Sequence, residues 1–262
     1  MFALFFLGGV VPSLIQVLFT RLTTKAGVDV NGMPVDVLRK GQVDMLKAAY
    51  DSTGDHAEAI ANYLADCPLV LWVLFKGTLV FLPLLVLLVG YDQIAGEVQH
   101  RTIRYLTGRA HRGSLVFGKA IGIWIVVSIM VLVLHATVWA LMMAKGSAGM
   151  GVILSWGLRM AVFCMFYAWA YAGITSLFSS IFRTPVVSLF VGAGILFGMF
   201  LARLALSIFE STQKAAWLFP PTYEDLLVSP DPLRSIGGLG LLIVWGLLCT
   251  LGASEILRRR DV

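Results

Sequence analysis

Charged residues are scarce in this sequence. Only 13% of its 262 residues are Asp, Glu, Lys or Arg, whereas 58% are hydrophobic. A soluble globular domain carries about 25% charged residues, and the mean hydropathy here is +0.86. A chain this apolar cannot cover its surface with polar groups, so we predict a polytopic membrane protein surrounded by lipid, with no nucleic-acid partner.

Cysteine is also rare: the sequence contains three, Cys67, Cys164 and Cys249. The last two fall inside apolar runs, where a thiol behaves as a small hydrophobic side chain. The sequence shows no disulfide framework and no cluster with metal-ligand spacing. We therefore predict no metal site.

Catalytic signatures are missing as well. The sequence contains no His-Glu-x-x-His, no Gly-x-Ser-x-Gly and no pair of carboxylates within an apolar run. Residues 113–119 fit the phosphate-loop pattern G-x-x-x-x-G-K, but Ala120 follows where a Mg²⁺-binding hydroxyl is required. No strand precedes this stretch and an apolar run follows it. We predict that the chain is not an enzyme and binds no cofactor itself.

Acidic residues are absent from the interiors of the apolar runs. Carriers driven by protons or sodium ions usually need buried carboxylates. This absence indicates that the energy for any transport comes from a partner.

Six apolar runs are long enough to cross a bilayer, which takes about 20 residues. We expect an all-α fold with six transmembrane helices in one domain, 1–262. The first run has no basic region before it and no small-residue cleavage site, so it is interpreted as a retained span rather than a signal peptide. The predicted spans lie near 2–20, 68–90, 119–143, 152–182, 186–206 and 237–255.

The polar segments between the spans divide into two sets. Segments 21–67 and 207–236 share one side, and 21–67 is expected to hold short amphipathic helices at 34–50 and 55–66. The other side receives 91–118, the turn at 183–185 and the carboxyl end. Basic residues on this second side lie close to span ends in short segments, where the positive-inside bias acts, although Arg21 and Lys25 oppose it. We predict that both termini are cytoplasmic.

Residues 91–118, which we call the coupling segment, are the most informative part of the chain. Asp92 and Glu97 open the segment, arginines follow, and Ile94 and Val98 are interleaved with polar residues. This pattern indicates an amphipathic, partly helical connector at the membrane surface. One interpretation is a solvated loop whose arginines bind lipid head groups. Because ordinary connectors are only a handful of residues long, a docking surface for another protein is favoured.

The coupling segment resembles that of type-two ABC transporter permeases, whose pattern is close to D-x-I-A-G-E, then G/R-T-hydrophobic, a leucine-rich turn, P-x-S-R and G-K. Ala110 and His111 stand where the pattern has Pro and Ser, and the basic end at 257–261 is also similar. Such permeases often have a cytoplasmic helix before the first span. Here the first apolar run begins directly after Met1, so two interpretations stay open: a true start further upstream, or a permease without this helix. The matching residues are Asp92, Ile94, Ala95, Gly96, Glu97, Arg101, Thr102, Ile103, Tyr105, Leu106, Arg112, Gly118 and Lys119.

The resemblance implies a permease subunit, most simply of an exporter in a bacterial inner membrane. Two separate ATPase subunits would bind ATP and Mg²⁺, and a second permease copy or a homologue would complete the path. Glu97 and the arginines would form ion pairs across the interface with the ATPase. The implied ATPase-coupling residues are Asp92, Glu97, Arg101, Thr102, Arg104, Leu106 and Arg112.

Four basic residues lie inside the apolar runs: Lys76, His135, Arg159 and Arg203. A charge at mid-membrane costs about 2.5–3.5 kcal/mol. At a helical rise of about 1.5 Å per residue, the first three lie about 10–12 Å from the outer ends of their spans. Snorkelling to the head groups is the simpler interpretation, and we favour it for Arg203. We hypothesise that Lys76, His135 and Arg159 line an outer vestibule for an anionic or lipid-like cargo.

We consider two other classes of function for this chain. A membrane scaffold or signalling subunit would transmit ATPase motion to an extracytoplasmic complex without moving cargo, with 21–67 as its docking surface. A membrane-embedded enzyme is disfavoured because catalytic groups are missing. An ATPase encoded beside this chain would support the permease and the scaffold, and a periplasmic binding or maturation protein would favour the scaffold.

Overall fold

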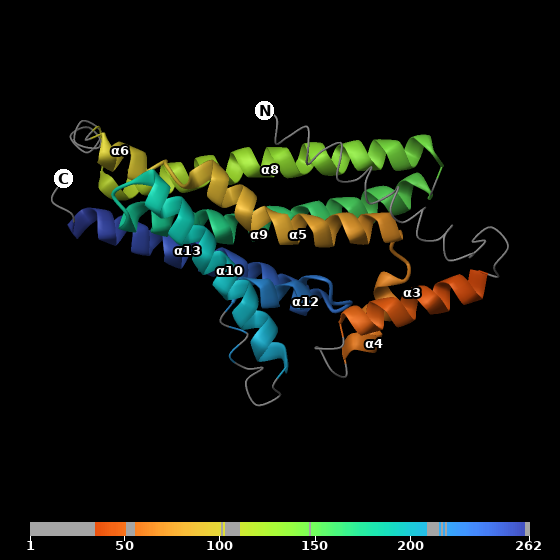
Figure 1. Ribbon diagram of the computed structural model, residues 1–262. Coiled ribbons are helices and arrows are strands. Elements are labelled where there is room, and N and C mark those ends of the chain that lie inside the picture. Colours follow the sequence, from red (N-terminus) through yellow and green to blue (C-terminus); the bar gives the residue numbers. More distant parts are fainter. Residues whose placement is uncertain are drawn as a thin grey trace. The chain divides into compact units, whose positions relative to one another are not determined.

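The structure is a computed structural model. It describes residues 35–50, 56–100, 102, 111–146, 148–208, 215, 217 and 219–259. Over these ranges the chain forms helices and no strand (Figure 1). The predicted first span, 2–20, lies outside the described residues.

Five long helices match the other five predicted spans. Each is long and apolar enough to cross a membrane. They are α5 (Leu69–Gly90), α8 (Arg112–Ala144), α9 (Met150–Ile181), α10 (Pro185–Ile208) and α13 (Pro232–Arg259).

Two of these helices begin earlier than hydropathy predicted. The α8 helix begins at Arg112 instead of 119, so the last residues of the coupling segment form its first two turns. The α13 helix begins at Pro232 instead of 237. Proline suits the first helical turn because it has no N–H to satisfy, and the Asp231 carboxylate accepts a hydrogen bond from the Leu233 N–H at 3.0 Å. In both cases the helix extends beyond the predicted apolar run into residues of mixed polarity.

The shorter helices lie in the polar segments. Helices α3 (Val35–Ala49) and α4 (Ala57–Leu64) match the amphipathic helices expected at 34–50 and 55–66. The remaining short helices are α6 (Ala95–Gln99), the 3₁₀ helix η4 (Pro220–Tyr223) and α12 (Glu224–Leu227).

The contacts of the chain group it into two compact units. The first comprises the described residues up to Lys76, with Met130–Ala161 and Val228–Pro230. The second comprises Gly77–Ile129, Val162–Leu227 and Asp231–Val262. The single domain predicted over 1–262 stays a prediction.

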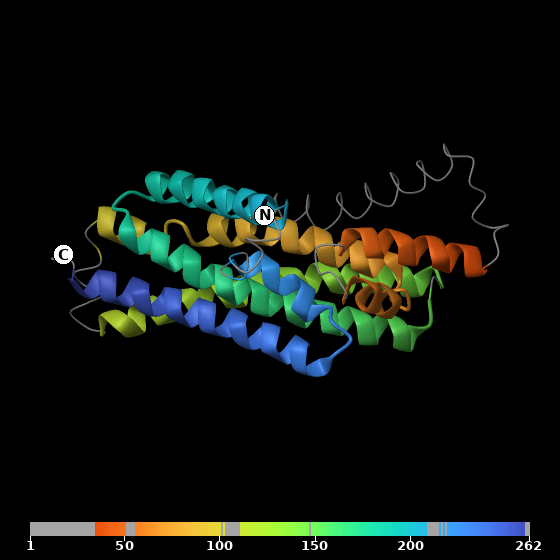
Figure 2. The same ribbon diagram turned by 90° about the horizontal axis from the view of Figure 1, so that it is seen from below.

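The core of the second unit is built on the last third of α9. Residues 170–176 and 178–180 are all buried. Helices α9 and α13 lie side by side in both views (Figures 1 and 2), and they approach at glycines. A Cβ added to Gly173 would lie 2.4 Å from the Gly246 carbonyl oxygen, and one added to Gly246 would lie 2.3 Å from Trp169 Nε1. Small residues allow this close backbone approach, which drives helix association in membranes.

The end of α5 is held in the same unit. A Cβ on Gly90 would lie 2.6 Å from Ile123 Cδ1 of α8 and 2.8 Å from Thr175 Cγ2 of α9. Gly90 is therefore packed against both helices. This contact fixes the point from which the coupling segment starts.

We expect Gly173→Ala to destabilise the protein by about 1–3 kcal/mol, the usual cost of overpacking. The added methyl would meet Gly246 backbone, which has no flexible side chain to move aside. Thermal unfolding in detergent measures the effect. Gly194→Ala in α10 is the control, because nothing lies within 4 Å of a Cβ there. Equal melting temperatures for the two variants would contradict the close crossing.

Candidate functional site

The coupling segment begins with a tight turn at 91–94 and continues as α6. The Gln93 N–H donates to the Gly90 carbonyl at 3.3 Å, and the Gly96 N–H donates to the Asp92 carbonyl at 2.7 Å. The Thr102 hydroxyl donates to the Glu97 carbonyl at 3.3 Å. The prediction of a partly helical connector is confirmed for this first part. Three of the predicted coupling residues, Arg101, Arg104 and Leu106, lie outside the described residues.

The first N–H groups of α6 are satisfied by a side chain from α9. The N-cap residue, Ile94, has no side chain that can accept a hydrogen bond. The Ser179 hydroxyl takes this role: it accepts from the Ile94 and Ala95 N–H groups, each at 3.0 Å, and donates to the Tyr91 carbonyl at 3.0 Å. A serine hydroxyl has one donor and two acceptor positions, and all three are used here.

These groups are removed from solvent. Ile94 is 1% exposed, and Ala95 and Ser179 are fully buried. A buried N–H that loses its partner costs about 1–3 kcal/mol. Ser179 therefore fixes the start of α6 to α9. This role of Ser179 was not predicted from the sequence. The end of the fourth predicted span does contain a cluster of small hydroxyl side chains: Thr175, Ser176, Ser179 and Ser180.

The apolar face of the coupling segment packs inside the protein. Ile94 forms a buried cluster with Val116 of α8 and with Ala253 and Leu257 of α13, and Val98 packs against this cluster. The interleaved hydrophobic positions that the sequence indicated are thus used for packing against span ends.

Glu97 is paired within the chain. Its Oε1 lies 2.6 Å from the Lys119 Nζ, with the two side chains 25% and 19% exposed. Lys119 also donates to the Gln93 carbonyl. The expectation was that Glu97 pairs across an interface with the ATPase. Because α8 begins at Arg112, Lys119 lies two turns later, against α6. The predicted contact of Glu97 with the ATPase stays a prediction.

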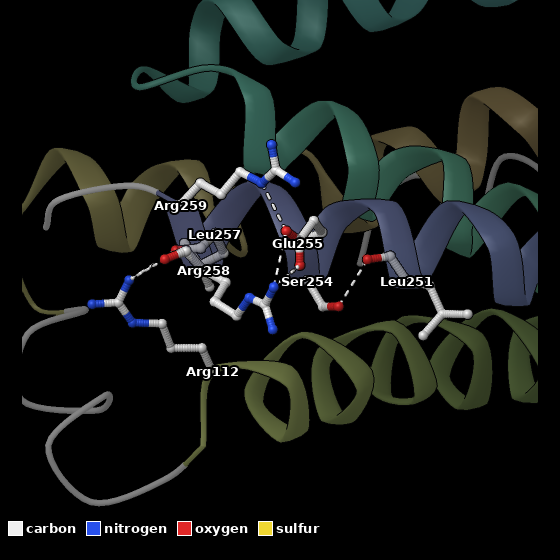
Figure 3. Close-up of polar contacts among 7 residues, drawn as sticks. All are labelled: Arg112, Leu251, Ser254, Glu255, Leu257, Arg258 and Arg259. Atoms are coloured by element: carbon white, nitrogen blue, oxygen red, sulfur yellow. Dashed lines mark hydrogen bonds and ion pairs between the residues drawn. The ribbon is translucent and has the colours of Figure 1, made fainter.

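Arg112 is also directed inward, to the end of α13 (Figure 3). Its Nη1 donates to the carbonyls of Leu257 and Arg258, both at 3.0 Å. The last carbonyls of a helix have no partner within it, and a positive charge is favoured at this negative end of the helix dipole. Arg112 therefore connects α8 to α13, and its predicted role in ATPase coupling stays a prediction. We call the meeting point of these segments the junction, comprising Tyr91, Ile94, Ala95, Glu97, Arg112, Val116, Lys119, Ser179, Ala253 and Leu257.

Other polar side chains among the described residues of this region are exposed. The turn at 183–184, between α9 and α10, is exposed, and it lies close to α6, because a Cβ on Gly96 would lie 3.9 Å from Pro185 Cγ. We call this set of exposed residues the outer polar face. It consists of Asp92, Gln99, His100, Thr102, Arg183 and Thr184.

In the first unit, Lys76 lies against aromatic rings. Its Nζ is 4.2 Å from the centroid of the Tyr50 ring and 5.8 Å from that of Trp72. The Trp72 Nε1 donates to the Tyr50 hydroxyl at 3.3 Å. A cation over an aromatic face is stabilised by the ring quadrupole. Lys76 thus links α5 to the end of α3.

Arg159 joins α9 to α4 in the same unit. The guanidinium lies 5.2 Å from the Tyr63 ring centroid and donates to the Tyr63 hydroxyl. Its Nη2 donates to the Ser229 carbonyl at 3.1 Å. Tyr63 in turn packs on Trp156, with ring centroids 4.8 Å apart.

His135, the third predicted path residue, is 1% exposed. Its Nδ1 donates to the Val131 carbonyl at 2.9 Å, and its Nε2 has no hydrogen-bond partner among the described residues. The three residues predicted to line a vestibule therefore have three different sets of neighbours.

Arg203, in the second unit, lies close to acidic side chains. Snorkelling to lipid head groups was favoured, but the guanidinium lies 3.8 Å from a Glu224 carboxylate oxygen and 4.0 Å from an Asp225 oxygen. Both acids belong to the first turn of α12. The cation is therefore compensated by acidic groups of the chain itself.

Two observations bear on cofactors. Residues 113–119, which fit the phosphate-loop pattern, lie inside α8, so they form a helix rather than a loop that surrounds a phosphate. Within the part of the chain that the structure describes, no group of three or more His, Cys, Asp or Glu side chains is placed to hold a metal ion.

Five long apolar helices, with the short helix α6 between two of them, are typical of a polytopic membrane protein. The chain belongs to the ABC-2 family of transporter proteins, whose pattern matches residues 1–236. The resemblance found in the sequence is confirmed. Members of this family generally lack catalytic activity. None of the curated proteins compared with this chain matches it.

We expect Glu97→Lys or Lys119→Glu to destabilise the protein by about 1.5–3 kcal/mol, because each places like charges together in a partly buried site. The double variant that exchanges the two charges should recover most of this loss. Thermal unfolding in detergent of the two single variants and the double variant gives the coupling energy. Additive losses in the double variant would contradict the pair.

Arg159→Leu and Tyr63→Phe should each lower stability, because each removes the bond between α9 and α4. The double variant should lose less than the sum of the single losses, with a coupling energy of about 0.5–3 kcal/mol. Thermal unfolding again provides the measurement. If Arg159 only lines a path for cargo, Arg159→Leu will leave the melting temperature unchanged.

Proposed function

We propose that this chain is the permease subunit of an ATP-driven exporter, in which its spans form the translocation path and separate ATPase subunits drive it. One observation carries the proposal: α6 is fixed to the ends of α8, α9 and α13, while its polar side faces outward. An element that receives force from a partner needs both properties, a free docking surface and a stiff attachment to the helices that move.

The junction supplies the attachment. A displacement of α6 acts on α9 through the Ser179 hydroxyl and on α8 through the Glu97–Lys119 pair. The Ile94 side chain, packed against Leu257, extends the contact to α13. A displacement of α6 is thereby transmitted to three spans.

The outer polar face supplies the docking surface. Asp92 and His100 are exposed at the two ends of α6, and Arg101 and Arg104 follow in the sequence. Desolvated charge pairs at a protein interface can contribute several kcal/mol. We assign docking to these residues and to Thr102, and we assign Glu97 and Arg112 to the attachment.

The remaining parts of the proposal come from the family resemblance and, for the topology and the vestibule, from the basic residues of the sequence. Two ATPase subunits bind ATP and Mg²⁺, this chain binds no cofactor, and a second permease copy or a homologue completes the path. Both termini are cytoplasmic in a bacterial inner membrane. A vestibule for anionic or lipid-like cargo is formed by Lys76, His135 and Arg159, and unchanged transport in Lys76→Leu and Arg159→Leu would refute this part.

The test is co-purification with the ATPase encoded nearest to this chain, in mild detergent. We expect wild-type protein to retain the ATPase and Asp92→Arg to reduce its recovery at least tenfold, which corresponds to about 1.4 kcal/mol. Asp44→Arg is the control, because Asp44 is equally exposed but lies on α3. It should leave recovery unchanged.

Glu97→Arg is less suitable for this test because it also breaks the pair with Lys119. Failure of the wild-type chain to retain any ATPase would refute the proposed function. Equal recovery for Asp92→Arg and Asp44→Arg would instead show that docking does not use the outer polar face.

A further inference from the structure

We infer that Ser179 is a positioning residue that makes α6 and α9 move as one body, so that α9 receives the force applied to α6 through this hydroxyl. The inference rests on the proposed function and adds the route of transmission. It is carried by the three bonds of one hydroxyl, which joins the end of α5, the start of α6 and the body of α9.

The turn at 91–94 shows why this hydroxyl matters. The turn lies between α5 and α6, and other contacts of α6, the Glu97–Lys119 pair and the cluster around Ile94, join it to α8 and α13. Ser179 bonds to the Tyr91 carbonyl at the beginning of the turn and to the Ile94 and Ala95 N–H groups at its end. The Ser179 hydroxyl oxygen therefore joins the two ends of the turn and also attaches the turn to α9.

The α9 helix is suited to distribute a displacement. Close to Ser179, a Cβ on Gly192 of α10 would lie 3.2 Å from Phe178 Cδ2 of α9. The contacts of Thr175 with α5 and of Gly173 with α13 follow along the same helix. Motion of this end of α9 is therefore transmitted directly to three neighbouring helices.

Ser180 provides a matched control next to Ser179. It is also fully buried, but its hydroxyl donates to the Leu177 carbonyl of its own helix at 2.7 Å. Removal of either hydroxyl takes one oxygen atom from the same buried region. Only Ser179→Ala also removes a bond between α6 and α9.

The first experiment measures hydrogen exchange of the full-length protein in lipid nanodiscs. Ser179→Ala should accelerate exchange of the Ile94 and Ala95 amides at least tenfold, because both lose their acceptor. Ser180→Ala should leave these rates within twofold of wild type. Unchanged protection of both amides in Ser179→Ala would overturn the inference.

The second experiment measures transmission in the complex with the ATPase. A spin label is attached at Leu158→Cys, because Leu158 is an exposed residue of α9 (57%) far along the helix from Ser179. The readout is the spectral change between the nucleotide-free complex and the complex trapped with ATP and vanadate. We expect this change in the otherwise wild-type and Ser180→Ala backgrounds, and at least a threefold smaller change in Ser179→Ala.

ATPase binding and ATP hydrolysis should stay within twofold of wild type in Ser179→Ala, which separates lost transmission from general unfolding. An undiminished spectral change in Ser179→Ala, or no change in the wild-type background, would overturn the inference. If the wild-type chain binds no ATPase, the proposed function fails, and the exchange rates of Ile94 and Ala95 decide whether Ser179 holds α6 in place.

Discussion

The ends of helices in an apolar protein carry polar backbone groups that must find partners, and the second unit of this chain is organised by that requirement. The start of α6 is satisfied by Ser179 of α9, and the end of α13 by Arg112 of α8. In surroundings of low dielectric constant an unpaired polar group is costly. The same bonds that remove this cost also attach each helix end to its neighbour.

Charged residues of the coupling segment divide into two groups that a sequence motif does not distinguish. Glu97 and Arg112 are turned towards α8 and α13 and hold the junction together. Asp92 and His100 are exposed. Charge reversal in the first group would change both the folding of the chain and its docking. Charge reversal in the second group tests the docking surface alone.

The sequence predicts the five described spans well, because long apolar runs leave few alternatives. It places the start of α8 too late, since hydropathy detects the long apolar run and not the two turns of mixed polarity before it. Ser179 was missed because a serine in an apolar helix carries no sign of a partner 85 residues away along the chain. The contacts of Arg112 and Arg203 could not be predicted from the sequence, because the carbonyls and carboxylates that they contact come from distant segments.

The length of α6 sets a limit on how it can act. A helix of five residues is far below the roughly 12–15 residues needed for marginal stability in isolation. Its shape therefore depends on the contacts that surround it, namely the Ser179 hydroxyl, the Lys119 ammonium and the cluster around Ile94. A force applied to α6 cannot be carried by the rigidity of the helix itself. It must pass through these contacts, so the strength of the junction determines how much of a partner's motion reaches the spans.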